Sequence, residues 1–133
     1  MDENDEICGE EEYLLINASY LSLEDAYREV TARGGVCYPA HIDRSSSGII
    51  SMLGDFPPEP HFTAFELNDI ASLADCLEKH PILKDRGLIH VASSDAHYLT
   101  DISEEGFEIE LEDEPYSSAK VRGALIDHLL GCG

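Results

Sequence analysis

Basic residues are scarce in this chain. Its 133 residues include 8 Lys and Arg against 28 Asp and Glu, which gives a formal net charge of −20. Binding to a nucleic-acid backbone requires a surface rich in Lys and Arg that neutralises the phosphates. A chain this acidic repels duplex DNA and RNA, so we expect no nucleic-acid partner for this chain alone.

Long hydrophobic runs and paired cysteines are also missing. No apolar stretch approaches the roughly 20 residues of a membrane-spanning helix, and the acidic N-terminus is the opposite of the basic start of a signal peptide. The 4 cysteines show no Cys-x-x-Cys spacing and are expected to be reduced thiols. These absences predict a cytoplasmic protein without a membrane partner.

The length permits one hydrophobic core but not a complete barrel. A (β/α) barrel needs roughly 200 residues or more, whereas this chain has 133. We therefore predict a single domain over residues 1–133, with an acidic and mobile N-terminus over residues 1–12. A second acidic cluster covers residues 104–114 and is expected to be solvated.

Short apolar runs alternate with segments of helical spacing along the chain. A helix is predicted after Ser22, where apolar residues recur at i, i+3, i+4 and i+7: Leu23, Ala26, Tyr27 and Val30. The other predicted helices cover 49–53, 69–80 and 118–130, and the predicted strands cover 13–17, 36–38, 64–67, 88–92 and 106–111. This alternation predicts an α/β fold, with helices packed on a mostly parallel sheet of about four or five strands.

Three side chains of metal-ligand type follow two of the predicted strands. His41 comes after the strand at 36–38, and Asp95 and His97 come after the strand at 88–92. The C-terminal ends of parallel strands meet at one edge of the sheet, where α/β folds keep their chemistry. Imidazole and carboxylate groups bind Zn²⁺, Mn²⁺ and Fe²⁺, so these residues predict part of a divalent-metal site.

Other polar residues are candidates for supporting roles. Glu66 ends a predicted strand and is a candidate auxiliary ligand or hydrogen-bond partner of a ligand, the alternative being a carboxylate that faces solvent. Arg44 and Ser45 are candidate phosphate contacts, because a guanidinium matches phosphate with two parallel hydrogen bonds. Structural roles are expected for the remaining imidazoles: His61, His80, His90 and His128.

Two motifs in this order resemble the last two metal motifs of the polymerase and histidinol phosphatase (PHP) family. They are Gly-Gly-Val-Cys-Tyr-Pro-Ala-His, which ends at His41, and Ser-Asp-Ala-His, which ends at His97. The likeness extends to further segments along the chain: Leu21-Ser22-Leu23-Glu24, Asp43-Arg44, Phe65-Glu66-Leu67 and Tyr98-Leu99. The resemblance implies a distorted (β/α) barrel that holds up to three divalent metals and hydrolyses phosphoesters.

The early motifs of that family have no match here. They comprise a His-x-His segment and further His and Glu ligands from the next strands, whereas no His precedes His41. The resemblance therefore implies the C-terminal portion of a PHP domain with an incomplete metal site. The sheet edge and apolar face left by missing strands must be covered, which predicts self-association or rearranged packing.

Functions of two different classes fit these residues. The first is a portion of a metal-dependent phosphoesterase, a hydrolase in which metal-activated water attacks a phosphorylated small molecule or another phosphoester, inactive when the portion is alone. The second is a non-catalytic binding or regulatory module that keeps the PHP-like sheet. A His-x-His segment encoded upstream of Met1 would distinguish them.

Overall fold

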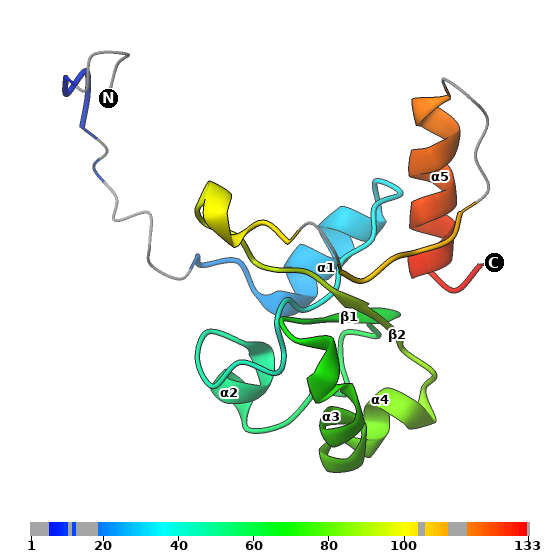
Figure 1. Ribbon diagram of the computed structural model, residues 1–133. Coiled ribbons are helices and arrows are strands. Elements are labelled where there is room, and N and C mark those ends of the chain that lie inside the picture. Colours follow the sequence, from blue (N-terminus) through cyan, green and yellow to red (C-terminus); the bar gives the residue numbers. More distant parts are fainter. Residues whose placement is uncertain (1–5, 11, 13–18, 104–105, 112–116, 133) are drawn as a thin grey trace.

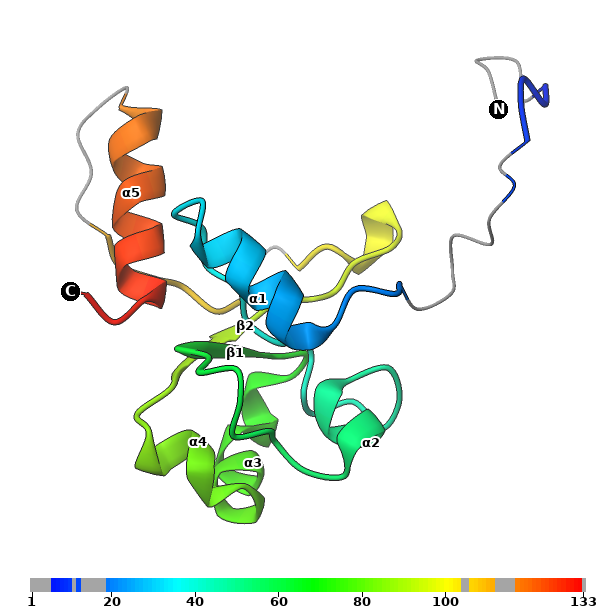
Figure 2. The same cartoon turned by 180° about the vertical axis from the view of Figure 1, so that it is seen from behind.

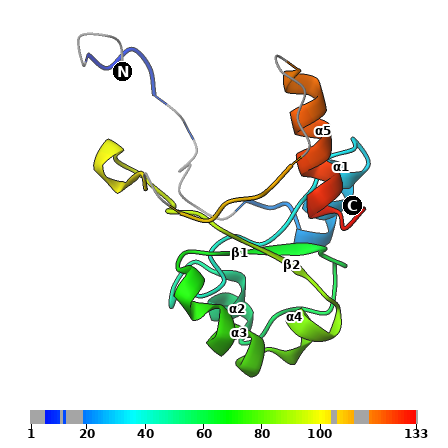
Figure 3. The same ribbon diagram turned by 45° about the vertical axis from the view of Figure 1, so that its right-hand side comes forward.

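The computed structural model describes residues 6–10, 12, 19–103, 106–111 and 117–132. In this part of the chain the fold is α/β, as predicted, with helices on both sides of a small parallel sheet. Figures 1 and 3 show one helical layer below the sheet, consisting of α2 (Ile49–Leu53), α3 (Leu73–Lys79) and α4 (Pro81–Asp85). The remaining helices lie above it: α1 (Leu23–Thr31) and α5 (Ser118–Leu129).

The sheet consists of β1 (Ala64–Leu67) and β2 (Ile89–Ala92), which are parallel and pair from Ala64 with Ile89 to Leu67 with Ala92. The chain returns from β1 to β2 through a 3₁₀ turn, η1 (Ile70–Ser72), followed by α3 and α4. Pro81 is the first residue of α4, where its missing N–H costs no helical hydrogen bond. This βαβ unit confirms the strands predicted at 64–67 and 88–92 and the helical region between them.

A third extended segment lies beside β1 without forming a regular strand. The Glu66 N–H donates to the Pro39 carbonyl (3.0 Å), and the Ile42 N–H donates to the Glu66 carbonyl (2.9 Å). This is the bonding pattern of parallel neighbours, except that the segment carries one more residue than regular pairing allows. The bulge coincides with a positive φ of 33° at His41. The predicted strand at 36–38, which precedes the bulge, forms no strand in the structure.

The lower face of the sheet carries the principal core. Phe65 and Leu67 point into it and are fully buried, as is Leu83 from α4. Cys76 of α3 and Ile42 of the bulged segment complete its centre. Burying aromatic and aliphatic side chains of this size contributes about 1.5–3 kcal/mol each, so this layer supplies most of the stability of the described fold.

The upper face carries a smaller apolar cluster. Ala64 and Val91 on the strands pack with Leu129 of α5. The Thr63 hydroxyl donates to the Leu129 carbonyl (2.7 Å) and so fixes the end of α5 against the start of β1. Figure 2 shows α5 standing away from the sheet beyond this point of attachment.

Local capping explains where α1 begins. The Ser22 hydroxyl accepts a hydrogen bond from the Asp25 N–H (3.1 Å), as predicted for a serine N-cap. From α1 the Tyr27 hydroxyl donates to the His61 carbonyl (2.8 Å), and its ring packs edge-on against Phe62. One helix face therefore attaches α1 to the segment that leads into β1.

Two expectations about the sheet are wrong for the described residues. The sheet has 2 strands there instead of about four or five. The segment 106–111 alternates half-buried and exposed residues as predicted, yet it forms no strand. A gap of about 410 Å³ beside β2 is lined by residues of both segments, among them Ile89, His90, Phe107 and His128. The alternation arises because Phe107 and Ile109 pack on the upper cluster.

Several other expectations concern residues outside the described part or stay predictions. The predicted strand at 13–17 lies outside the described residues, as does much of the acidic N-terminus. All four cysteines are free, and burial raises the pKa of the Cys37 and Cys76 thiols. A raised pKa keeps a thiol protonated and unreactive at neutral pH.

Self-association is the first testable prediction. Large apolar side chains are exposed at Met52 (75%), Leu53 (61%) and Leu99 (88%), and the sheet ends after 2 strands in the described part. Apolar patches and open sheet edges favour association in water. Light scattering should show an average mass that rises with protein concentration, and a monodisperse monomer at high concentration would contradict this expectation.

Candidate functional site

The candidate site lies where three parallel segments end. His41 is at the end of the bulged segment, Glu66 is near the end of β1, and Asp95 and His97 follow β2. Because the segments are parallel neighbours, these ends meet at one edge of the sheet. The structure therefore places the loops that carry the predicted ligands side by side.

His41 is held in an unusual conformation. Its φ of 33° is positive, which is uncommon for residues other than glycine. A Cβ at Gly48 would lie 2.9 Å from the His41 carbonyl oxygen, so the loop after His41 folds back over it only because residue 48 is glycine. The imidazole Nδ1 is buried and has no hydrogen-bond partner among the described residues.

An ion pair connects the loops after the bulged segment and after β2. Arg44 donates from Nη1 to Asp95 Oδ2 across 51 residues of sequence. The Arg44 side chain is 45% exposed and that of Asp95 is 24% exposed. Asp95 also has a positive φ of 51°. Two residues with a positive φ, His41 and Asp95, thus lie on adjoining loops.

His97 is oriented by a local hydrogen bond. Its Nδ1 lies 2.7 Å from the Asp95 carbonyl oxygen. A carbonyl oxygen only accepts, so Nδ1 carries the proton and the lone pair of the neutral ring lies on Nε2. Imidazoles that bind metals are commonly fixed by a backbone carbonyl in this way. The exposed His97 ring is therefore in the tautomer suited to a ligand.

Glu66 extends the polar cluster to the upper side of the sheet. Its Oε1 accepts a hydrogen bond from the Ser93 hydroxyl (2.6 Å). Burial raises the pKa of the Tyr38 phenol, and the negative charge of Glu66 raises it further. Glu66 is thus a half-exposed carboxylate with a protein partner, and both of its candidate roles, auxiliary to a ligand or facing solvent, stay open.

Asp43 is the site residue whose role the sequence reasoning missed. Its carboxylate accepts hydrogen bonds from the N–H groups of Asn68 (2.8 Å) and Asp69 (2.9 Å) and from the Ser72 hydroxyl (2.9 Å). Burial acts to raise the pKa of Asp43, but these hydrogen bonds outweigh it and lower the pKa. Asp43 therefore fastens the loop after His41 to the loop after β1. In the sequence, Asp43 was noted only as part of Asp43-Arg44, one of the segments that resemble the PHP family.

The candidate ligands are of the chemical types that bind a divalent cation, but they do not lie together around one point. An unpartnered buried nitrogen on His41 and a ligand-ready tautomer on His97 are the groups that an imidazole-binding cation requires. The Asp95 carboxylate is paired with Arg44. Within the described residues, no three side chains of His, Cys, Asp or Glu are close enough together to hold a metal ion. Ser45 is exposed in the loop beside Arg44.

A cavity of about 510 Å³ opens beside this edge of the sheet. Asn68 and Asp69 after β1 line one wall, and Ser93 and Ser94 after β2 line another. Its other described lining residues include Ser103 and Glu108. The described lining offers hydroxyl, amide and carboxylate groups without a Lys, Arg or His side chain, so it suits a neutral or cationic hydroxylated group.

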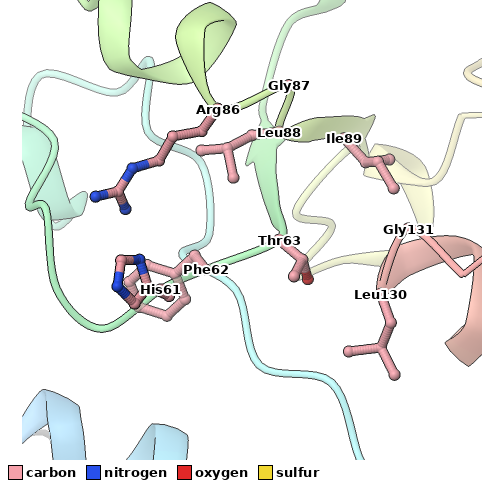
Figure 4. Close-up of a pocket in the computed structure, with 9 residues that line it drawn as sticks. All are labelled: His61, Phe62, Thr63, Arg86, Gly87, Leu88, Ile89, Leu130 and Gly131. Atoms are coloured by element: carbon pink, nitrogen blue, oxygen red, sulfur yellow. The ribbon is translucent and has the colours of Figure 1, made fainter.

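A second cavity of about 550 Å³ lies at the opposite end of the strands. Figure 4 shows His61 and Arg86 at one side of it and Leu130 of the C-terminal segment at the other. The guanidinium of Arg86 donates a hydrogen bond from Nη1 to the Pro58 carbonyl oxygen (2.7 Å). His61 Nε2 lies 2.9 Å from Glu59 Oε1. Crevices outside the C-terminal ends of parallel strands are the usual ligand sites, and this second cavity lies at the other end of the strands. The predicted ligands His41, Asp95 and His97 line neither cavity.

The remaining imidazoles lie away from the predicted ligands. His80 pairs with Asp55 (2.5 Å), and this hydrogen bond lowers the pKa of Asp55. The His90 ring packs between Phe65 and Phe107. His128 lines the gap beside β2. The structural roles of these imidazoles stay a prediction.

Comparison with known proteins found no matching family model, no matching curated protein and no matching solved structure. Among the described residues, no helix combines the length and the apolar character needed to cross a membrane.

Proposed function

We propose that this chain is the C-terminal portion of a PHP-type, metal-dependent phosphoesterase, with a distorted (β/α) barrel as the complete domain. The single observation that carries the proposal is the meeting of the His41, Glu66 and Asp95 loops at the C-terminal edge of parallel segments. The order of the two motifs that end at His41 and His97 supports the same family.

Each candidate residue has a role in this proposal. His41, Asp95 and His97 contribute ligands to a divalent cation (Zn²⁺, Mn²⁺ or Fe²⁺), and Glu66 is an auxiliary ligand or orients one. Arg44 and Ser45 contact the phosphate of a phosphorylated small molecule or other phosphoester. When bound, the cation supplies a water of lowered pKa and charge stabilisation for the phosphoryl group.

The described residues support weak cation binding by the isolated chain. An imidazole must be neutral to donate its lone pair, so cation binding by these side chains depends on pH. Two or three adjacent cations need more imidazole and carboxylate donors than these residues provide. The isolated chain should therefore hold one cation weakly and hydrolyse an aryl phosphate at a rate near background.

Mn²⁺ binding tests the proposal directly. The signal of free Mn²⁺ in electron paramagnetic resonance falls as the ion binds, which gives a dissociation constant without any activity assay. Asp95→Ala and His97→Ala should each weaken binding at least about tenfold, the effect of losing a ligand or its orienting partner. His128→Ala is the matched control and should bind as the unaltered chain does, because it lies in the gap beside β2.

The activity measurement separates a portion of an enzyme from a complete one. Restoring an upstream segment that carries a His-x-His motif should produce metal-dependent phosphoesterase activity. Rapid metal-dependent turnover by the 133 residues alone would contradict the incomplete site. Unchanged Mn²⁺ binding in both the Asp95 and the His97 variants would refute the ligand assignment.

A binding or regulatory module is the second candidate function. Exposed apolar side chains on the turn after His97 favour it: Tyr98 is 75% and Leu99 is 88% exposed. They lie in and beside the 3₁₀ turn η2 (Leu99–Asp101), where a partner could contact them. Failure of the upstream segment to produce activity, together with retained folding, would favour this module over the enzyme.

A further inference from the structure

Arg44 engages the carboxylate that the proposed cation site requires. Its Nη1 pairs with Asp95 Oδ2, so the negative charge of Asp95 is already neutralised by a side chain of the same chain. A divalent cation placed on the same carboxylate would lie close to the guanidinium and would be repelled by it. The Arg44–Asp95 pair and a cation at Asp95 therefore compete.

We propose that the Arg44–Asp95 ion pair is an exchangeable contact that couples phosphate binding to cation binding. A phosphate that binds Arg44 draws the guanidinium away from Asp95, and the freed carboxylate then accepts the divalent cation. This inference rests on the proposed function and adds that the two ligands strengthen each other's binding.

The exposure of the two partners permits this exchange. The Arg44 side chain is 45% exposed, and within the described residues its only side-chain hydrogen bond goes to Asp95, so further N–H groups can reach an anion. Phosphate offers the guanidinium two parallel charge-assisted bonds in place of one. The additional charge-assisted hydrogen bond favours transfer of the Arg44 guanidinium from the Asp95 carboxylate to the phosphate.

Asp95 is less exposed than Arg44 and is held by its backbone. Its side chain is 24% exposed, and leaving a carboxylate of this exposure without a positive partner is unfavourable. Its carbonyl oxygen accepts the hydrogen bond of His97 Nδ1, so the two groups keep a fixed relation. Only the Arg44 side chain needs to move, and a cation replaces it at Asp95.

The coupling is reciprocal by thermodynamic necessity. If phosphate raises the affinity for the cation by some factor, the cation raises the affinity for phosphate by the same factor. The chain carries a formal charge of −20, which alone would repel phosphate. Joint binding with a cation removes part of that repulsion. The expected behaviour is weak binding of either ligand alone and stronger binding of both.

The experiment measures Mn²⁺ binding by electron paramagnetic resonance with and without inorganic phosphate, using the full chain. For the unaltered chain, phosphate should tighten Mn²⁺ binding about fivefold or more, as typical couplings do. Arg44→Ala should bind Mn²⁺ more tightly without phosphate and should lose the response to phosphate. Arg33→Ala is the matched control, because it removes the same charge from an ion pair with Glu29 on α1.

The outcomes separate this inference from the proposed function. Equal Mn²⁺ affinity in the unaltered chain and in Arg44→Ala, with binding still lost in Asp95→Ala, overturns the coupling and leaves the ligand assignment intact. An equal response to phosphate in the unaltered and Arg44→Ala chains also overturns it. Mn²⁺ binding that persists unchanged in Asp95→Ala overturns the coupling, and if it also persists unchanged in His97→Ala the ligand assignment is refuted as well.

Discussion

Replacing Phe65 with alanine should lower the free energy of unfolding by about 3–5 kcal/mol, the usual cost of deleting a buried aromatic side chain. Phe65 is fully buried in the centre of β1 and packs with Leu67 and Leu83 in the lower core. Small domains have a total stability of about 5–15 kcal/mol, so this loss would remove a large part of it.

Urea unfolding followed by circular dichroism measures this effect, because the chain has no tryptophan to report by fluorescence. Met52→Ala is the matched control: its side chain is 75% exposed on α2, and its removal should change stability little. A loss below about 1 kcal/mol for Phe65→Ala would show that the lower core is not assembled as described.

Replacing Asp43 with alanine should cost about 2–3 kcal/mol, because a charged acceptor is removed from several donors in a half-buried loop. The N–H groups of Asn68 and Asp69 and the hydroxyl of Ser72 would lose their common partner. The same change should loosen the loop after His41 relative to β1 and so weaken Mn²⁺ binding. Urea unfolding and Mn²⁺ titration measure the two effects.

The contribution of Asp43 should depend on pH with a defined sign. Burial of Asp43 in the folded protein acts to raise its pKa, but these hydrogen bonds have the larger effect, so the pKa is lowered. The folded state therefore binds the proton more weakly than the unfolded chain does. The stability that Asp43 contributes is lost as the pH falls and the group becomes protonated. The difference between the unaltered chain and Asp43→Ala should be full above about pH 4 and should shrink below it.

Asp75→Ala provides the matched control for Asp43. Asp75 lies on α3 and pairs with Lys79 (2.7 Å) at the surface, with both side chains more than half exposed. Surface pairs of this kind contribute little to stability. If Asp75→Ala and Asp43→Ala had equal effects, the carboxylate of Asp43 would not be the fastening between the two loops.

The sequence by itself determined the elements whose causes are local. Helix α1 begins at Leu23 because the Ser22 hydroxyl caps an N–H group three residues away and apolar residues recur with helical spacing. The apolar run at 64–67 was sufficient to predict β1 with its bounds. Such features depend on residues a few positions apart, so composition and spacing contain the information.

The sequence also identified the loops that carry the candidate site. His41 and Asp95 each follow an apolar run, and parallel pairing brings the ends of such runs to one edge. What spacing could not predict was the ionic partner of Asp95, because Arg44 is 51 residues away in sequence. It likewise did not reveal that Asp43 holds the loop after β1.

Only the tertiary structure decided how the extended segments are used. The run at 106–111 has the alternation of a strand, and Phe107 and Ile109 pack on the upper cluster, but its backbone does not pair with β2. The segment leading to His41 joins β1 through a bulge that no pattern in the sequence indicates. Alternation reports only which face of a segment is buried, whereas strand pairing depends on which backbone groups the fold brings within hydrogen-bonding distance.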